Sequence, residues 1–116
     1  MEAIETIDDF TRNIKEHKIV LSFFYAGWCR PSERQFSIVE KLSSEYSEKI
    51  RFISVDADKA DALCDRYNVK TLPELIFFGE GEIIEALLGF QQEAYIREYI
   101  DFLAKQAVEA TQEGKK

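Results

Sequence analysis

Apolar side chains recur at helical spacing in four stretches of the chain. The first helix should start at Thr6, where Asp9 three residues later forms a capping-box-like pair, and should end near His17. The second should start at Pro31, because proline lacks the N–H group that is unpaired in a helix's first turn. The apolar face of this second helix consists of Phe36, Val39, Leu42 and Tyr46. The third helix has Ala60, Leu63, Cys64 and Tyr67 on one side, and the fourth has Tyr95, Ile96, Tyr99, Ile100 and Leu103.

Continuous apolar runs predict the strands. Ile19–Tyr25 is rich in branched and aromatic residues, which is typical of a central strand covered on both faces. Ile50–Val55 predicts a second strand, parallel to the first because a helix connects them. Leu75–Phe78 and Ile83–Leu88 flank the Gly79–Gly81 loop and predict an antiparallel hairpin. The pattern predicts an α/β fold, with a mixed central β-sheet flanked by helices on both faces.

Composition narrows the classes of protein that this sequence fits. A chain of 116 residues that is 46% hydrophobic can bury one core, so we expect a single domain over residues 1–110 and a polar tail over 111–116. A net charge of -7 argues against binding to nucleic acid or to an anionic membrane. The acidic N-terminus and the lack of a membrane-length apolar run lead us to expect a cytoplasmic protein, which we take to be a monomer.

Cys29 is the first candidate for chemistry. The segment Trp28–Ser32 falls where the central strand ends and a long helix begins, the position of many active sites in α/β proteins. Unpaired backbone N–H groups at a helix start favour a negatively charged sulfur, and the adjacent Arg30 acts in the same direction. The alternative is that Cys29 is a small buried apolar residue, as many free cysteines are.

Several segments together resemble the thioredoxin family, and the resemblance covers essentially the whole chain. They are Val20–Ser32, Lys70–Pro73, Gly79–Gly81 and Gly89. The resemblance implies that Cys29 attacks a substrate disulfide, that Trp28 flanks the sulfur and that Pro73, preceded by a cis bond, faces it. It also implies that the backbone of Leu72 pairs with a bound peptide and that Gly89 borders the same groove. Arg30 and Pro31, from the cysteine motif, join these substrate-binding residues.

The chain departs from the family pattern at several positions. Ser32 stands where the family has its second active-site cysteine, and a hydroxyl cannot resolve a mixed disulfide. Either a cysteine was replaced there, or the protein naturally works with one thiol. Phe23 and Ser54 occupy the positions of the family's buried acid and its lysine companion. Glu74 follows Pro73 where a small polar residue is common, and we expect it to add negative charge beside the groove.

The remaining candidate groups favour structural roles. Cys64 shares the apolar face of its helix, so we expect a buried, inert thiol. His17 should be a solvated loop residue, and no cluster of metal ligands surrounds it. The acidic run Asp56, Asp58 and Asp61 lacks the glycine and glutamate of a calcium loop. We therefore expect no metal and no other cofactor.

Two functions from different classes fit the sequence. The first is thiol–disulfide exchange on protein disulfides, with Cys29 as the catalytic nucleophile and Ser32 in place of the resolving cysteine. Its partners would be disulfide-containing proteins and, as the source of electrons, a thioredoxin reductase or glutathione. The second is a peptide-binding or adaptor module that keeps the groove without catalysis.

Overall fold

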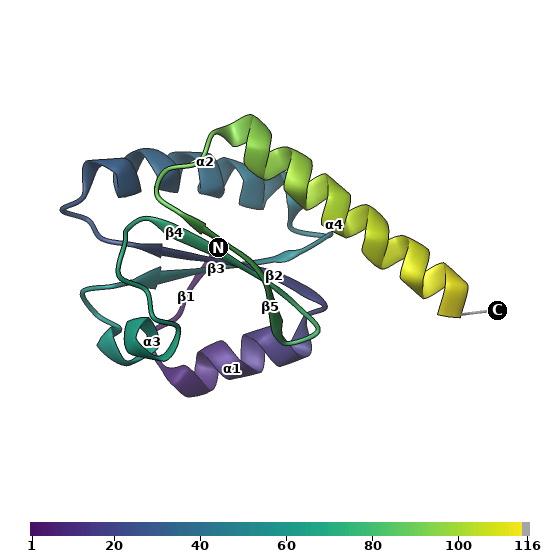
Figure 1. Cartoon of the computed structure of the whole chain (residues 1–116), viewed down its shortest axis with the longest axis horizontal. Helices are drawn as coiled ribbons and strands as arrows, with labels where there is room; N and C mark the ends of the chain where they lie inside the picture. The colour runs from purple at the N-terminus through teal and green to yellow at the C-terminus, as the bar shows by residue number, and fades with distance from the viewer. Residues whose placement is uncertain (115–116) are drawn as a thin grey trace.

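The computed structural model describes residues 1–114, with side chains described through residue 107. A five-stranded sheet in the order β1-β3-β2-β4-β5 forms its centre (Figure 1). The strands are β1 (Glu2–Ala3), β2 (Ile19–Tyr25), β3 (Arg51–Asp56), β4 (Glu74–Gly79) and β5 (Glu82–Leu88). The helices are α1 (Ile7–Glu16), α2 (Arg30–Tyr46), α3 (Asp61–Arg66) and α4 (Glu93–Gly114).

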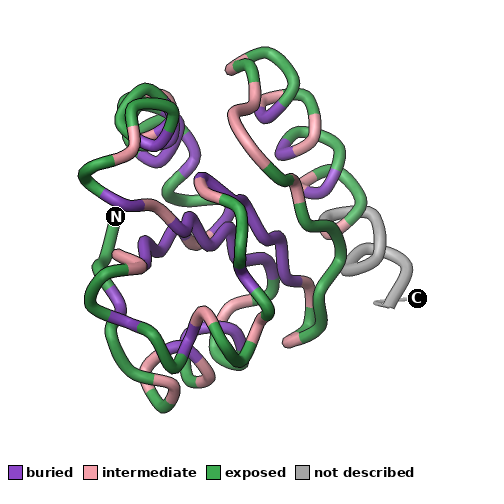
Figure 2. Tube along the Cα trace, turned by 60° about the vertical axis from the view of Figure 1, so that its left-hand side comes forward, coloured by how far each residue is buried: buried purple, intermediate pink, exposed green. Residues whose placement is uncertain are grey.

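The helices form two layers on opposite faces of the sheet. Helices α1 and α3 cover one face, and α2 and α4 cover the other (Figure 1). β2 serves both faces: Leu21 and Phe23 contribute to the core under α2 and α4, whereas Val20 and Phe24 contribute to the core beneath α1 and α3. Figure 2 shows buried positions concentrated along the strands and on the inner sides of the helices. The unbroken apolar run of β2 is therefore explained by burial on both faces.

Most of the predicted elements are confirmed. β2 lies in the middle of the sheet, parallel to β3 and antiparallel to β4. Thr6 caps α1 by accepting a hydrogen bond from the Asp9 N–H at 3.1 Å. The hairpin between β4 and β5 turns through Glu80 and Gly81. Both residues have a positive φ, as the two central residues of a type I′ turn require.

Two features differ from or extend the sequence expectations. The short strand β1 was not predicted; it pairs in parallel with β3 at Ile53 and Ser54. Two residues carry too little hydrophobic periodicity to indicate a strand. Helix α4 continues through Gly114, into the expected polar tail, and residues 115–116 lie outside the described part of the chain. The domain boundary at residue 110 stays a prediction.

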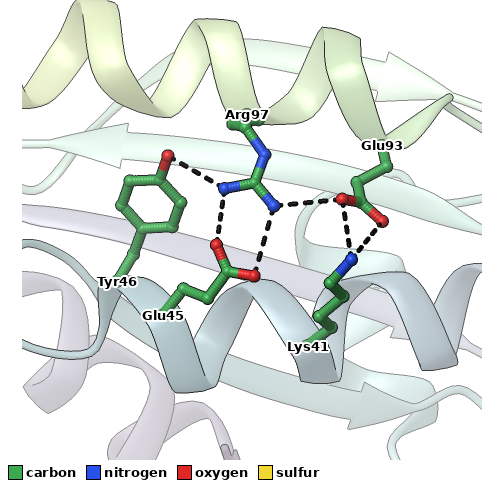
Figure 3. Close-up of polar contacts among 5 residues, drawn as sticks. All are labelled: Lys41, Glu45, Tyr46, Glu93 and Arg97. Carbon is green, nitrogen blue, oxygen red and sulfur yellow. Dashed lines mark hydrogen bonds and ion pairs between the residues drawn. The ribbon is translucent and has the colours of Figure 1, made fainter.

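A polar network joins the two helices on one face of the sheet. Arg97 of α4 pairs with Glu45 of α2 and with Glu93 one turn earlier, and its Nη1 lies 3.4 Å from the Tyr46 hydroxyl (Figure 3). Lys41 of α2 completes the network by pairing with Glu93 at 3.2 Å. These contacts fix α4 against α2 at the rim of the core.

No helix within residues 1–114 has the length and apolar character needed to cross a membrane.

Candidate active site

Cys29 lies at the junction between β2 and α2. Its backbone N–H donates to the Ala26 carbonyl and its own carbonyl accepts from the Glu33 N–H, each at 3.1 Å, so it is the N-cap of a 17-residue helix. The Cys29 side chain is half-buried, and its Sγ lies 3.8 Å from the Leu72 carbonyl oxygen. The thiol is therefore held at the positive end of α2, against a loop from the other half of the chain.

That second loop carries the predicted proline. The Leu72–Pro73 peptide bond is cis, and Pro73 is buried. The Pro73 carbonyl accepts a hydrogen bond from the Gly89 N–H at 2.8 Å, and Gly89 has a φ of +79°, which favours glycine. Leu72, Pro73 and Gly89, predicted as groove residues, thus form a connected backbone unit that contacts Cys29 through Leu72.

The other residues of the cysteine motif are divided between the surface and the interior. Arg30 and Pro31 are exposed in the first turn of α2, where the proline was expected. Ser32 is completely buried, and its Oγ accepts a hydrogen bond from the Ala26 N–H at 3.4 Å. The Ser32 hydroxyl is thus held beneath the turn that carries Cys29.

Trp28 is the most exposed large apolar side chain of the site. Its exposed fraction is 71%, and its indole Nε1–H donates to Asp58 Oδ1 at 3.2 Å. Asp58 in turn belongs to the loop after β3, where its N–H donates to the Asp56 side chain at 3.0 Å. In the sequence Asp58 stands out only as part of an acidic run, and its 30-residue separation from Trp28 leaves no local signal for this contact.

Glu74 is placed differently from the expectation. It was predicted to add negative charge beside the groove, but its side chain is only 4% exposed, and its Oε1 has no hydrogen-bond partner. Burial raises the pKa of the Glu74 carboxyl and so favours its neutral form. The reason is register: Glu74 pairs with Phe24, and this position lies on the sheet face that α1 and α3 cover.

The positions of the family's buried acid and lysine hold residues without titrating side chains. Phe23 is fully buried and stacks on Tyr25, with ring centroids 5.2 Å apart. Ser54 is also buried, and its hydroxyl lies 3.5 Å from the Glu2 carbonyl of β1. An aromatic core and a contact between strands therefore replace an internal acid–base pair.

Cys64 occupies a different environment from the one predicted. It packs against the core under α3 but is half-buried, not fully buried, because α3 is only six residues long and lies at the surface. Burial and, to a lesser degree, three nearby carboxyl groups raise the pKa of the Cys64 thiol; these groups belong to Asp61, Asp65 and Glu74. A raised pKa lowers the thiolate fraction at neutral pH.

His17 ends helix α1 and is half-exposed, close to the solvated position expected for it. Within the described residues, no three His, Cys, Asp or Glu side chains come together as metal ligands would. The geometry therefore draws attention to Cys29 and the residues around it.

Comparisons with known proteins agree with the fold. A family model for thioredoxin matches residues 2–102. Thioredoxin-1 of Caenorhabditis elegans is 34% identical over 100 residues, which cover 84% of this chain and 86% of that protein. Thioredoxin C-2 of Corynebacterium nephridii is 32% identical over 82 residues, or 71% of this chain and 76% of that one.

Solved structures show the same architecture. The X-ray structure of Fasciola hepatica thioredoxin superposes with a TM-score of 0.80 at 28% identity, covering 87% of this chain and 97% of that one. A mutant thioredoxin from Halobacterium salinarum gives a TM-score of 0.80 at 27% identity, covering 86% and 87% of the two chains. The chain therefore has the thioredoxin fold and belongs to the thioredoxin family.

Proposed function

We propose that this protein carries out thiol–disulfide exchange on protein disulfides with Cys29 as the nucleophile. Membership of the thioredoxin family implies thiol–disulfide oxidoreductase activity in general. The observation that carries the assignment to Cys29 is its placement. The Sγ stands at the start of α2, 3.8 Å from the Leu72 carbonyl and beside an exposed Trp28, so a disulfide can approach it.

The first step of the proposed exchange reaction needs only one thiolate. The Cys29 thiolate attacks one sulfur of a substrate disulfide, a new S–S bond forms to Cys29, and the other substrate sulfur leaves as a thiolate that takes up a proton. The substrate is then half-reduced and covalently attached to the protein.

Ser32 determines what happens to that intermediate. In a dithiol protein a second cysteine would attack the Cys29 sulfur, whereas the buried Ser32 hydroxyl holds a backbone hydrogen bond and has no thiol to offer. An external thiol, such as glutathione, must therefore attack the Cys29 sulfur and release the substrate as a thiol. A further thiol then frees Cys29 and leaves as a disulfide. If a cysteine was replaced at position 32, the protein with the original cysteine would instead be reduced by a thioredoxin reductase.

The cellular setting belongs to the same proposal. Both cysteines are unpaired in the structure, which accords with a reducing compartment, and we assign the protein to the cytoplasm as a monomer. Cell fractionation and sedimentation analysis test these two assignments.

A direct experiment uses insulin as the disulfide substrate. The protein is incubated with insulin without reductant, quenched with acid, and analysed by intact mass. The parent chain and a Cys64→Ala variant should both form a mixed-disulfide adduct with insulin that dithiothreitol releases. Cys29→Ala should form none. An adduct of equal yield in Cys29→Ala would contradict the assignment.

The buried Ser32 also favours a second candidate, a peptide-binding adaptor. A site without a resolving thiol can still bind a peptide beside Leu72, Pro73 and Gly89 without turnover. An adaptor would hold its partners through non-covalent contacts, so reductant would not release them and Cys29→Ala would still bind them.

A further inference from the structure

Gln35 is a completely buried polar side chain on α2, one turn beyond Ser32. It makes two reciprocal hydrogen bonds with the backbone of Gln91: its Oε1 accepts from the Gln91 N–H at 2.6 Å, and its Nε2 donates to the Gln91 carbonyl at 3.2 Å. A buried amide with both ends satisfied fixes the two groups that it joins. Gln35 therefore ties α2 to the segment between β5 and α4, residues 89–92, which we call the β5–α4 loop.

Two further contacts hold the same loop. The Arg34 guanidinium lies over the Phe90 ring, 4.4 Å from its centroid, so consecutive α2 residues contact consecutive loop residues. Gln91 turns its own side chain back along the loop, where Nε2 lies 3.2 Å from the Leu88 carbonyl and 3.3 Å from the Gly89 carbonyl. The β5–α4 loop is thus held by side chains of α2 and by the side chain of its own Gln91.

The β5–α4 loop is also joined to the segment that contacts the thiol. Gly89 donates its N–H to the Pro73 carbonyl at 2.8 Å, and the neighbouring Leu72 carbonyl lies 3.8 Å from Cys29 Sγ. Hydrogen bonds therefore run from Gln35 through Gln91 and Gly89 to Pro73. This path starts on α2, the helix that begins after Cys29, and ends at Pro73, next to the Leu72 carbonyl that contacts the thiol.

We propose that Gln35 is a positioning residue that sets the wall of the peptide site, so that Cys29 reacts efficiently with disulfides in extended peptides. This inference rests on the proposed function of Cys29. Gln35 touches neither the sulfur nor the substrate; it acts through Gln91 and Gly89. A preorganised wall lowers the cost of ordering a bound peptide, whereas a small disulfide that needs only the sulfur gains nothing from it.

The experiment compares two probes that release the same chromophore. One is 2,2′-dithiodipyridine, and the other is a short extended peptide whose central cysteine is joined to 2-thiopyridine. In both, Cys29 attacks a sulfur, forms a mixed disulfide and releases pyridine-2-thione, which is followed by absorbance. Every variant carries Cys64→Ala, so that Cys29 is the sole thiol, and Cys29→Ala serves as the blank. Rates are measured under pseudo-first-order conditions.

Gln35→Met, which keeps the side-chain volume and loses both hydrogen bonds, should slow reaction with the peptide about tenfold. Its rate with 2,2′-dithiodipyridine should change by less than about twofold, since attack at the exposed side of the sulfur does not use the wall. Gln35→Glu keeps the acceptor for the Gln91 N–H and, in the neutral form that burial favours, an O–H donor, so it should restore part of the peptide rate. The exposed Arg34→Met, which removes only the ring contact, should show the same selectivity on a smaller scale.

Equal slowing with both probes would overturn the proposal, because Gln35 would then act on Cys29 itself or on the fold. An unchanged peptide rate in Gln35→Met would overturn it as well. If Gln35→Met fails to fold, as judged by circular dichroism, the same comparison of probes in Gln35→Glu and Arg34→Met decides the matter. A protein with native Gln35 that reacts with neither probe would instead refute the proposed function of Cys29.

Discussion

The two cysteines have similar exposure but different surroundings. Both side chains are half-buried; Cys29 caps the start of a helix and Cys64 lies within one, and each helix follows a strand of the same sheet. Cys29 stands at the start of the 17-residue α2, with Arg30 exposed beside it. Cys64 lies within the six-residue α3, among carboxyl groups that, together with burial, raise the pKa of its thiol.

Exposure alone therefore does not distinguish the two thiols. A position at the start of a long helix, beside a loop that a substrate can share, provides both the unpaired N–H groups of the helix's first turn and a binding surface. A position inside a short acidic helix provides neither.

The largest effect is expected from Ser32→Cys. A thiol at this buried position would attack the mixed disulfide from within the molecule. Turnover of insulin with dithiothreitol should rise by about a hundredfold or more, because a neighbouring thiol has a much higher effective concentration than a dissolved one. Turbidity of the reduced insulin chain measures the rate. Equal rates for the parent chain and the Ser32→Cys variant would mean that Cys64 or the external thiol already resolves the intermediate efficiently.

Alkylation should separate the native thiols directly. With a brief pulse of iodoacetamide at about pH 7, Cys29 should be modified about tenfold faster than Cys64, whose raised pKa lowers its thiolate fraction. Peptide mapping by mass spectrometry gives both rates in one sample, and labelling in denaturant provides the control in which the two thiols react alike. Faster modification of Cys64 in the folded protein would reverse the assignment and move the reactive site to α3.

Glu74, on the Cys64 side of the comparison, should govern a pH dependence of stability. Burial raises the pKa of this carboxyl in the folded state, so the folded chain holds the proton more tightly than the unfolded one. Its stabilising contribution is complete below the ordinary glutamate pKa of about 4.3 and is lost as pH rises through the folded value.

The isosteric Glu74→Gln removes this ionisation. It should raise the free energy of unfolding at about pH 7 by about 1 kcal/mol relative to the parent, and the gain should shrink towards about pH 4. Urea unfolding at the two pH values tests this expectation, with the exposed Glu82→Gln as the matched control. A gain of the same size at both pH values would show that ionisation of Glu74 is not its cause.

The smallest effect is expected from Arg97→Ala, far from both thiols in the network that joins α2 to α4. Its partners are partly exposed, so the loss of thermal stability should be slight and should diminish in high salt. The ratio of Cys29 to Cys64 alkylation should stay unchanged. A changed ratio would show that packing of α4 controls the thiols, which would weaken an account based on local surroundings.

The sequence predicts the parts of this molecule that depend on local pattern. The apolar run of β2 and the cap at Thr6 are confirmed, because periodicity reports burial directly. Most positions on the apolar faces of the helices are also buried, but Tyr95, predicted on the apolar face of α4, is exposed. The order of segments along the chain also led to the family. Contacts between distant residues left no such signal, as for Asp58 with Trp28.

Glu74 shows why the expected site differs in detail from the observed one. Its place after Pro73 suggested a charge beside the groove, yet strand register turns the side chain into the opposite core. At Gln35, in contrast, the sequence does carry a signal for the observed contact. A glutamine on the inner face of α2 conflicts with the apolar pattern, and that conflict is a sequence signal for the buried polar contact with Gln91.

The central claim, that Cys29 and not Cys64 forms the covalent link to substrates, is tested by capture from a cell extract. The parent chain, Cys29→Ala and Cys64→Ala are each immobilised, exposed to extract without reductant, and washed in denaturant. Dithiothreitol should then elute proteins from the parent and from Cys64→Ala, and mass mapping before elution should place the linkage on Cys29. Proteins eluted from Cys29→Ala in equal amount, or a linkage mapped to Cys64, would contradict the account.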